Sequence, residues 1–442
     1  MIFLKSALAT FFICILFTSI SIGEPIKNKI DYSADSTLQQ QLDEYLSTLT
    51  QLKKFNGAVY FNANGKDILK KAYNLSADPN NSLHVSNDSQ FDIHSVSKLM
   101  AYSILVQLQE AHQLKISDTI CRYFPHFPNS HLITIDQLIH HRSGLPRELT
   151  NKSEKVLALT PDEILAAAAK EKLEFTPGSD TRYSNIGYEV IYYLIEKITG
   201  KPFAQCVKEF IFIPLHMNAS GAHFYTSHDN LKNLALNHQM RDGVIRQIPN
   251  LTQDEFPTAR IYSTTGDLLL YLQSLHKEPF LSAMRNAQGV IEKNGGSDGI
   301  RTQIYTNTRQ NYSFVLLSNY DEIPFQQTVT DLVKIMERKP FKLPAAINHK
   351  AITIPAAILS RYIGQYEFAE ANHARLEFRL QDKQLKLYRE NKMQASLHAE
   401  SKTVFFEKPE TSTTFEFIPD GDSWVMVWTY QGIAFKGMKV KQ

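Results

Sequence analysis

A serine and a lysine stand three residues apart at the start of an apolar segment with helical periodicity. Ser95 and Lys98 lie in FDIHSVSKLMAYSILVQL, residues 91–108, where apolar residues recur at intervals of three and four. Residues three apart share one face of a helix, so the lysine amine can reach the serine hydroxyl. A lysine buried among apolar neighbours has a lowered pKa and can accept a proton at neutral pH. We therefore predict that Ser95 is a nucleophile and that Lys98 activates it.

Two residues on a predicted loop could complete the acid–base chemistry. Tyr183 and Asn185 follow the Pro177-Gly178 turn and come just before a predicted helix. The phenol can carry a proton, and the carboxamide can form a hydrogen bond with a substrate. Because the two residues are close together on a loop, both side chains can face one cleft.

A strand end that contains glycine is the third candidate segment. Lys293, Asn294 and Gly295 are followed by Gly296 in VIEKNGGSDGI. Glycines at a strand end let the backbone approach a ligand closely. The Gly296 N–H and the Ser95 N–H, which is expected to be free at the helix N-terminus, are predicted to form an oxyanion hole.

Similar motifs elsewhere in the chain are predicted to be structural. Ser274 and Lys277 repeat the serine–lysine spacing at an expected exposed helix end, and Tyr305-Thr306-Asn307 falls in a predicted hairpin. Residues 295–299 match G-x-S-x-G, which would make Ser297 the nucleophile of an α/β-hydrolase. That motif requires a helix after the serine, whereas a strand and a turn are predicted here.

The histidines indicate neither a catalytic triad nor a metal site. His94 precedes Ser95 and would point away from it at a helix start, so we expect a packing or surface histidine. His140-His141 is expected at a helix end. No H-E-x-x-H motif or Cys/His cluster occurs, and we expect no metal or other cofactor.

The composition is that of a globular protein with little net charge. Among 442 residues, 43% are hydrophobic, and 47 Lys and Arg against 45 Asp and Glu leave a charge of +2. No basic block or RNA-binding aromatic motif is present, so a nucleic-acid partner is not expected.

The N-terminus resembles a signal peptide. Lys5 precedes an apolar stretch, and small residues allow cleavage before Glu24. We expect residues 1–23 to be removed and the mature chain to be exported without a stable membrane span; the alternative is an uncleaved N-terminal anchor. The two cysteines beyond this segment, Cys121 and Cys206, are expected to be separate buried thiols.

Strands are predicted at both ends of the main part of the chain. A hairpin turning at Asn64-Gly65 comes first, and strands return between residues 288 and 319. Helices and loops are expected across residues 115–285, and an amphipathic helix at residues 324–338. We predict an α+β fold in which an antiparallel sheet is flanked by helices and carries an inserted, mostly helical region.

The character of the chain changes after Arg338. A Pro/Ala-rich stretch, residues 341–353, is predicted to be a linker. Six short alternating strands follow, with the spacing typical of a small sandwich or barrel. We predict a main domain at residues 24–340 and a small all-β barrel domain at residues 354–442.

The three candidate segments resemble those of the serine β-lactamase and penicillin-binding-protein superfamily. S-V-S-K at 95–98, Y-S-N at 183–185 and K-N-G at 293–295 stand in the family's order and at about its spacing. ITIDQLIHHRSGLP and YSTTGDLLLYL are also similar to family segments. The branch that the chain resembles includes class C β-lactamases, D-stereospecific peptidases and related esterases. Its C-terminal strands resemble the lipocalin-like barrel of some members.

The resemblance implies a role for each matching residue. Ser95 would be acylated, Lys98 would activate it, and Tyr183 would pass protons to the leaving group and the deacylating water. Asn185 would bind the substrate amide, and Lys293 would support the tyrosine and attract a substrate carboxylate. The chain has Asn294 where the family usually has a hydroxyl residue. This departure bears on recognition of β-lactam or peptide carboxylates. Gly295 completes the motif.

The combined prediction is an exported serine hydrolase, periplasmic or secreted. It would act through an acyl-enzyme on a small-molecule or peptide substrate with an amide or ester bond. D-amino-acid peptides, other peptidoglycan-derived compounds, esters and β-lactams are the candidates. The alternative is a protein of the penicillin-binding type that binds cell-wall fragments without turnover, as a sensor.

Overall fold

The computed structural model describes residues 32, 36–150, 159–222, 231–241, 243–251, 256, 260–371, 373–389, 391–421 and 423–440. The predicted signal peptide, residues 1–23, lies outside these residues. The chain forms two compact units, one within Gly23–Glu322 and one that includes Ile323–Gln442. The domain boundaries inferred from the sequence stay predictions. No helix in the described part of the chain is long and apolar enough to cross a membrane.

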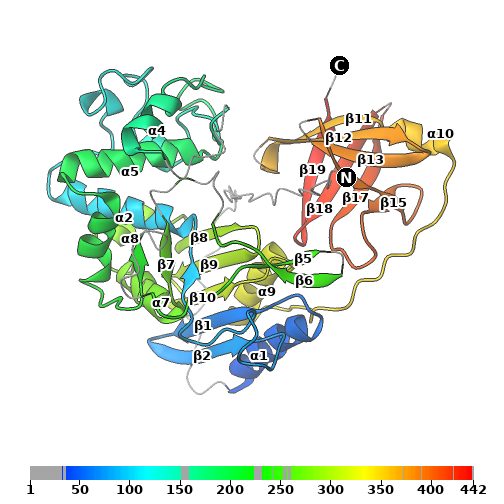
Figure 1. Ribbon diagram of the computed structural model, residues 1–442, viewed down its shortest axis with the longest axis horizontal. Helices are drawn as coiled ribbons and strands as arrows, with labels where there is room; N and C mark the ends of the chain where they lie inside the picture. Colours follow the sequence, from blue (N-terminus) through cyan, green and yellow to red (C-terminus); the bar gives the residue numbers. More distant parts are fainter. Residues whose placement is uncertain are drawn as a thin grey trace. The chain divides into compact units, whose positions relative to one another are not determined.

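The first unit is built on a five-stranded antiparallel sheet (Figure 1). Its strand order is β2-β1-β10-β9-β8, so the two ends of the unit meet in one sheet. This arrangement confirms the predicted sheet. The strands are β1 Gly57–Ala63, β2 Lys66–Tyr73, β8 Val290–Ser297, β9 Ile300–Asn307 and β10 Tyr312–Ser318.

The tight turns in this sheet follow from their residues. Asn64 and Gly65 have φ angles of 50° and 75° between β1 and β2, as a two-residue hairpin turn requires. Gly299, with φ of 74°, makes the turn between β8 and β9. The chain after Ser297 therefore continues as a strand.

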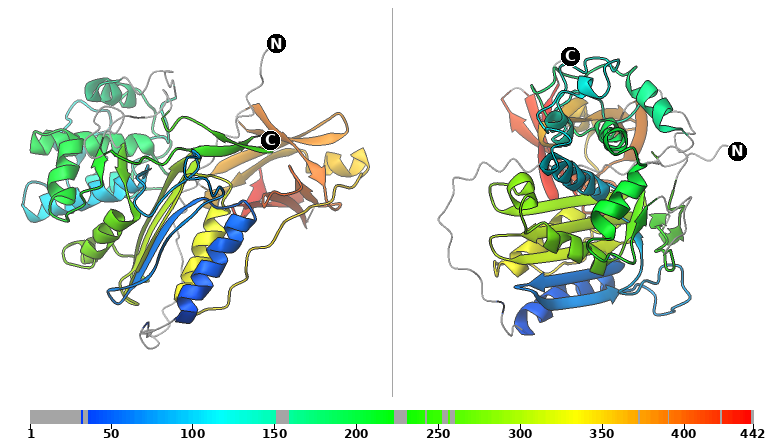
Figure 2. Two further views of the ribbon diagram at one scale, coloured as in Figure 1. Left: turned by 60° about the horizontal axis from the view of Figure 1, so that its bottom comes forward. Right: turned by 90° about the vertical axis from the view of Figure 1, so that its left-hand side faces the viewer.

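Helices cover both faces of the sheet. The helix α7 packs against β1, β9 and β10, and α2 packs against β8 and β9, whereas α1 packs against β2 on the opposite face (Figure 2). The helices of this unit are α1 Ser36–Gln51, α2 Val96–Glu110, α3 Ile135–Ile139, α4 Pro161–Ala168, α5 Asn185–Thr199, α6 Phe203–Val207, α7 Thr265–Ser274 and α8 Phe280–Met284.

Two of these helices are central, because they are buried on nearly every side. In α5 all residues from Ile186 to Ile195 are buried. Ser184 caps its start by accepting a hydrogen bond from the Gly187 N–H, and Gly200, with φ of 69°, ends it. The helix α2 is also largely buried, and its buried residues include Lys98. The position of Lys98 is thus set by the core.

Short strands complete the first unit. A three-stranded sheet has the order β3-β7-β4, and β5 and β6 form a hairpin. Their bounds are β3 Phe91–Asp92, β4 Gly221–Ala222, β5 His238–Arg241, β6 Val244–Gln247 and β7 Ile261–Ser263. Because β3 leads directly toward Ser95, this small sheet anchors the start of α2.

The second unit contains nine antiparallel strands in a nearly closed barrel, which confirms the predicted all-β barrel. The strand order is β14-β13-β12-β11-β19-β18-β17-β16-β15. The unit contains α9 Phe325–Met336, α10 Ala356–Leu359, β11 Gly364–Phe368, β12 Ala374–Gln381, β13 Gln384–Arg389, β14 Lys392–Ser396, β15 His398–Ala399, β16 Val404–Phe406, β17 Thr414–Asp420, β18 Ser423–Tyr430 and β19 Ile433–Lys439. The helix predicted at residues 324–338 is therefore confirmed as α9.

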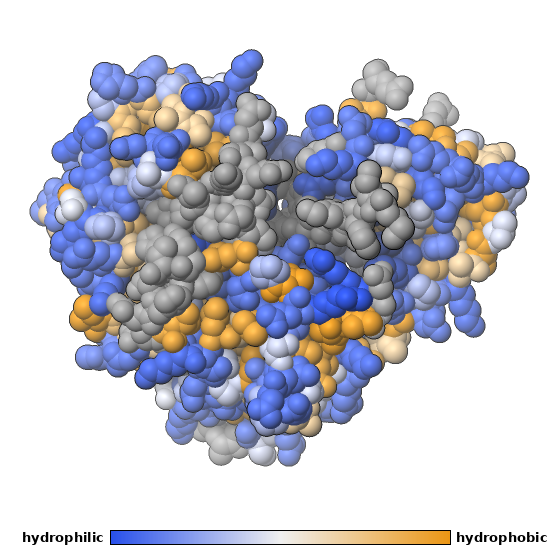
Figure 3. Space-filling model, viewed as in Figure 1, coloured by the Kyte–Doolittle hydropathy of each residue, from blue (hydrophilic) through white to orange (hydrophobic). Residues whose placement is uncertain are grey.

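Aromatic side chains fill the barrel. Along β17, Phe415 and Phe417 are buried, whereas Glu416 and Ile418 are exposed. Phe417 stacks on Tyr362 with ring centroids 4.3 Å apart. Hydrophilic residues dominate the visible outer surface of the barrel, around smaller apolar areas (Figure 3). The alternation along the strands explains this inside–outside difference.

Cys121 and Cys206 are both unpaired, which confirms the prediction of separate thiols. Cys206 is buried, but Cys121 is partly exposed. The expectation that both are buried was therefore wrong for Cys121. It lies in a short 3-10 turn, Ile120–Arg122, in which only Ile120 is buried.

Candidate active site

The Ser95 hydroxyl lies between the amine of Lys98 and the phenol of Tyr183. Lys98 Nζ donates a hydrogen bond to Ser95 Oγ over 3.1 Å, and the Tyr183 hydroxyl lies 2.8 Å from the same oxygen. Ser95 is the N-cap residue of α2, but its side chain makes no capping hydrogen bond. Its oxygen is therefore left to the two side chains that can take or give a proton.

Lys98 is held in a nearly dry environment one turn into α2. The residue is 7% exposed. Its Nζ lies 5.4 Å from the ring centroid of Tyr183 and 5.6 Å from that of Tyr188. Aromatic faces stabilise a cation at such distances. The two rings and the Ser95 hydroxyl therefore hold the amine in place.

Tyr183 is positioned by the start of α5. The Ser184 hydroxyl donates to the Pro146 carbonyl over 2.7 Å and accepts from the Gly187 N–H over 2.9 Å. These two bonds fix Ser184, and therefore the backbone of the neighbouring Tyr183, at the start of α5. Tyr183 itself is 3% exposed, so its phenol has little freedom to leave Ser95.

Three cationic side chains surround the Tyr183 ring. Lys98 Nζ and Lys293 Nζ each lie 5.4 Å from the ring centroid, and the Arg147 guanidinium lies 5.1 Å from it. Positive charges at this range stabilise negative charge on the phenol oxygen. The three side chains therefore place positive charge around the phenol.

The end of β8 closes against the loop that carries Ser95. A Cβ on Gly295 would lie 2.3 Å from the Ile93 carbonyl oxygen and 3.0 Å from the Ser95 nitrogen. Only glycine lets the two backbones come this close. Lys293 reaches the Tyr183 ring from this strand, and Asn294 and Gly296 are partly exposed beside it.

Asn185, the first residue of α5, is engaged by a side chain that the sequence analysis missed. Its Nδ2 donates to Glu148 Oε1 over 2.5 Å, and its backbone N–H donates to the Arg147 carbonyl over 3.0 Å. The loop at Arg147 and Glu148 thus borders both Tyr183 and Asn185. No spacing or composition signal marks these two residues, since only the fold brings the loop to α5.

His141, which the sequence analysis placed only at a helix end, packs directly on the tyrosine. The ring centroids of His141 and Tyr183 are 4.3 Å apart, and His141 Nδ1 accepts the Ser184 N–H over 3.2 Å. Burial, and then the charges of Lys293 and Lys98, lower the pKa of His141 well below its usual value. The ring is therefore neutral and adds no further charge beside the phenol.

The repeated motifs lie elsewhere and have structural partners. Ser274 ends α7 and donates to the Tyr271 carbonyl over 2.7 Å. Tyr305 lies in β9 and stacks on Phe314 and Tyr312 in the hairpin to β10. Ser297 ends β8, and the chain turns into β9 without a helix. None of these residues is placed as the G-x-S-x-G or serine–lysine chemistry would require.

His94, expected to be a packing or surface residue, has a buried side chain that contacts Asp92 and Arg260. Within the described ranges, no three His, Cys, Asp or Glu side chains come together as metal ligands would. At Ser95 the structure brings together a hydroxyl, an amine and a phenol within hydrogen-bond distance.

A family model described as Beta-lactamase matches residues 42–334, a span that contains all three motif segments and more than half of the chain. "Protein flp" of Staphylococcus aureus (strain N315) is 24% identical over 372 residues, which cover 74% of this chain and 70% of that protein.

Solved structures with low sequence identity share the fold. An octameric penicillin-binding protein homologue from Pyrococcus abyssi superposes with a TM-score of 0.58 at 16% identity, covering 91% of this chain and 99% of that one. A D-amino acid amidase from Ochrobactrum anthropi SV3, complexed with L-phenylalanine amide, gives a TM-score of 0.57 at 19% identity, covering 68% and 99%.

Proposed function

Because the chain belongs to the β-lactamase family, we propose that it is a serine hydrolase that forms an acyl-enzyme at Ser95. One observation carries this proposal: Lys98 Nζ and the Tyr183 hydroxyl both lie within hydrogen-bond distance of Ser95 Oγ. A site that only binds a ligand does not need proton-accepting groups beside the Ser95 hydroxyl. A serine nucleophile does need such a group, because it must lose its proton when it attacks.

Acylation begins when Ser95 Oγ attacks the substrate carbonyl carbon. The hydroxyl proton passes to Lys98 or Tyr183, and the carbonyl oxygen becomes negatively charged. The N–H groups of Ser95 and Gly296 hold that oxygen. The bond to the leaving group then breaks, and Tyr183 gives the departing nitrogen or oxygen a proton.

Deacylation repeats these steps with water. Tyr183 accepts a proton from the water as it attacks the acyl carbon, and Ser95 Oγ leaves and regains its proton. Lys98, Lys293 and Arg147 around the Tyr183 ring stabilise the negative charge that the phenol carries between these transfers. The neutral His141 ring keeps the phenol in place.

The proposed substrates are amides or esters, such as D-amino-acid peptides and other peptidoglycan-derived compounds. Asn185 would hold the substrate amide, and Lys293 with Asn294 and Gly295 would meet a carboxylate. The D-amino acid amidase and the penicillin-binding protein homologue, which share the fold, support amide substrates and penicillin-like compounds. We include β-lactams among the candidates.

The proposal extends to location and domain organisation. Residues 1–23 would direct export to the periplasm or the medium, with an uncleaved anchor as the alternative. The hydrolase domain would span residues 24–340, and residues 354–442 would form a lipocalin-like domain after the linker at 341–353. The protein would need no cofactor.

The experiment is intact-mass analysis combined with turnover assays. The full-length mature protein is incubated with activated esters, D-amino-acid amides, D-Ala-D-Ala peptides and penicillins. We expect a mass increase equal to the acyl group and release of product, both abolished by Ser95→Ala but not by Ser274→Ala. A stable adduct without turnover on any compound would favour the alternative of a penicillin-binding sensor. Turnover that survives Ser95→Ala would contradict the proposal.

A further inference from the structure

The residue before Ser95 has a backbone conformation that side chains rarely adopt. His94 has a φ angle of 44°, in the left-handed region where the Cβ of an L-residue is crowded. Glycine adopts this conformation without that crowding. Contacts with the surrounding residues must therefore hold the His94 backbone in this conformation.

A buried carboxylate holds the backbone of His94. Asp92 Oδ1 accepts a hydrogen bond from the His94 N–H over 3.0 Å, which closes a tight turn through a side chain. Asp92 is 0% exposed, and its Oδ2 forms an ion pair with Arg260 Nη2. A buried carboxylate needs such a partner to stay charged. Arg260 thus holds the Asp92 carboxylate in place, and that carboxylate holds the turn at His94.

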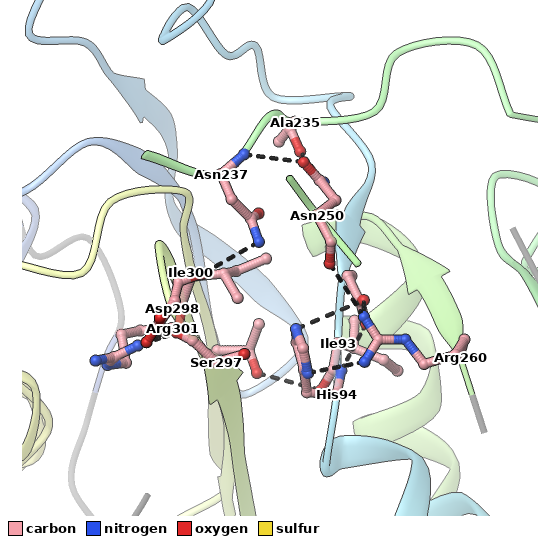
Figure 4. A network of polar contacts seen from close by, with 12 residues as sticks. Ile93, His94, Ala235, Asn237, Asn250, Arg260, Ser297, Asp298, Ile300 and Arg301 are labelled. Atoms are coloured by element: carbon pink, nitrogen blue, oxygen red, sulfur yellow. Dashed lines mark hydrogen bonds and ion pairs between the residues drawn. The ribbon is translucent and has the colours of Figure 1, made fainter. Parts of the chain in front are cut away.

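The His94 imidazole belongs to the same cluster (Figure 4). Arg260 Nη1 lies 3.3 Å from His94 Nδ1, and Asp92 Oδ2 lies 3.5 Å from His94 Nε2. Burial, and then the charge of Arg260, lower the pKa of His94 well below its usual value. The neutral ring can accept from the guanidinium at Nδ1, whereas its Nε2 is buried near Asp92 without a hydrogen bond in the described part of the chain.

The cluster lies directly behind the backbone that carries the nucleophile. The Ile93 carbonyl accepts the Val96 N–H over 3.0 Å and the Thr302 hydroxyl over 3.3 Å. In contrast, the Ser95 N–H has no hydrogen-bond acceptor within the part of the chain that the structure describes. The turn at His94 therefore sets the direction of the Ser95 N–H bond, since no hydrogen bond of that N–H does so in the described residues.

We propose that Asp92, Arg260 and His94 form a positioning cluster that aims the Ser95 N–H at the substrate oxygen. The proposal rests on the proposed function, since it assigns these residues to the oxyanion hole of the same site. None of the three touches the reacting atoms. They act through the Ser95 backbone, so they stabilise charge that develops after substrate has bound, and kcat should respond more than KM.

The test uses Arg260→Met and His94→Asn in the full-length mature protein. Arg260→Met removes the partner of Asp92, whereas His94→Asn keeps a residue that tolerates the left-handed conformation but is too short to reach Arg260. Hydrolysis of an activated ester and inhibition by phenylboronic acid are measured. The tetrahedral boronate on Ser95 Oγ places an oxygen where the oxyanion would lie.

We expect each substitution to lower kcat roughly 10- to 100-fold, with KM changed no more than about twofold. Boronate affinity should weaken by a similar factor. Because the residues act as one unit, the double variant should be little worse than Arg260→Met alone. Lys53→Asn is the matched control, since Lys53 is exposed and also left-handed with φ of 57°. It should leave the kinetics unchanged.

The outcomes separate this inference from the proposed function. Normal kcat and boronate affinity in folded His94→Asn would overturn the inference, even if Arg260→Met did not fold. A lowered melting temperature with unchanged kinetics would show that the cluster is only structural, and would also overturn it. Absence of any Ser95 adduct in the wild-type protein would instead overturn the proposed function, and this inference with it.

Discussion

Among single residues, Lys98 and Tyr183 are proposed to share the one proton that Ser95 gives up. Both contact the same oxygen, at 3.1 Å and 2.8 Å. Lys98 lies on the helix that Ser95 begins, whereas Tyr183 lies just before α5. The two side chains are therefore proposed to have different main tasks, although they act as one unit.

The first prediction separates these tasks. Lys98→Ala should block acylation by an activated ester, and Tyr183→Phe should slow both acylation and deacylation, each by ~10²–10⁴ in rate. Stopped-flow and intact-mass measurements distinguish the two steps. Tyr305→Phe is the control, because Tyr305 packs in a hairpin away from Ser95, and it should be nearly silent. If Tyr305→Phe lowered the two rates as much as Tyr183→Phe, the assignment of Tyr183 as the catalytic tyrosine would be wrong.

The second prediction concerns His141 and pH. Its pKa is lowered mainly by burial, so the folded protein keeps the ring neutral, whereas the unfolded chain takes up a proton near pH ~6.5. Protons then favour the unfolded chain, and the free energy of unfolding falls as the pH drops below that value, by at most about 1.4 kcal/mol per pH unit for this group.

Urea unfolding at pH 7.5 and pH 5.5 measures this effect. His141→Gln keeps an acceptor for the Ser184 N–H but cannot titrate, so its loss of stability on acidification should be smaller than that of the wild-type protein. Identical losses in both proteins would mean that His141 is protonated in the folded state.

The sequence alone was sufficient to select Ser95, Lys98 and Tyr183 as candidates, because their residue types and the periodicity after Ser95 are local signals. Arg147, Glu148 and His141 carried no such signal. Their importance arises from packing against α5, which follows them by more than thirty residues. The pairing of Asp92 with Arg260, separated by 168 positions, is likewise a property of the folded chain.

At the scale of elements, the site depends on the close approach of β8 to the loop before α2. The third prediction is that Gly295→Ala greatly slows acylation, because the new methyl group would overlap the Ile93 carbonyl oxygen and press on the Ser95 nitrogen. The overlap should also cost about 1–3 kcal/mol of stability. Acylation rate and urea unfolding measure both effects.

Gly266→Ala in α7 is the matched control for that substitution. Its added Cβ would meet nothing closer than 3.8 Å, and alanine favours a helix. This variant should keep full activity and equal or greater stability. If Gly295→Ala behaved like Gly266→Ala, β8 would not close against the nucleophile loop.

Elements with clear periodicity or turn residues were predicted well. The hairpin at Asn64-Gly65, the helix after Ser95 and the helix α9 are examples. The strands β11, β14 and β15 were not predicted, since none is longer than five residues. Their pairing depends on the barrel as a whole, which a local pattern does not encode.

At the scale of the whole molecule, all three motif segments belong to the unit within Gly23–Glu322. The barrel contributes no residue to the contacts described at Ser95. The fourth prediction is that a chain ending near residue 345 still becomes acylated at Ser95 by a small activated ester. Circular dichroism first establishes that this shortened protein is folded.

Reaction rates with larger substrates are then compared between the shortened and the full-length protein. A difference in these rates would show that the barrel contributes to substrate specificity. Complete loss of labelling in a folded shortened protein would instead mean that residues after 345 help to build the site. A variant shortened only by the last two residues serves as the control for handling and expression.

Peptide mapping of the acylated protein identifies the nucleophile directly. The full-length mature chain is acylated with an activated ester, trapped at low pH and digested, and the modified residue is identified by tandem mass spectrometry. We predict that the acyl group is attached to Ser95, in the peptide that also contains or adjoins Lys98. An acyl group on Ser297, in the G-x-S-x-G segment, would contradict the assignment of the nucleophile and the whole mechanism built on it.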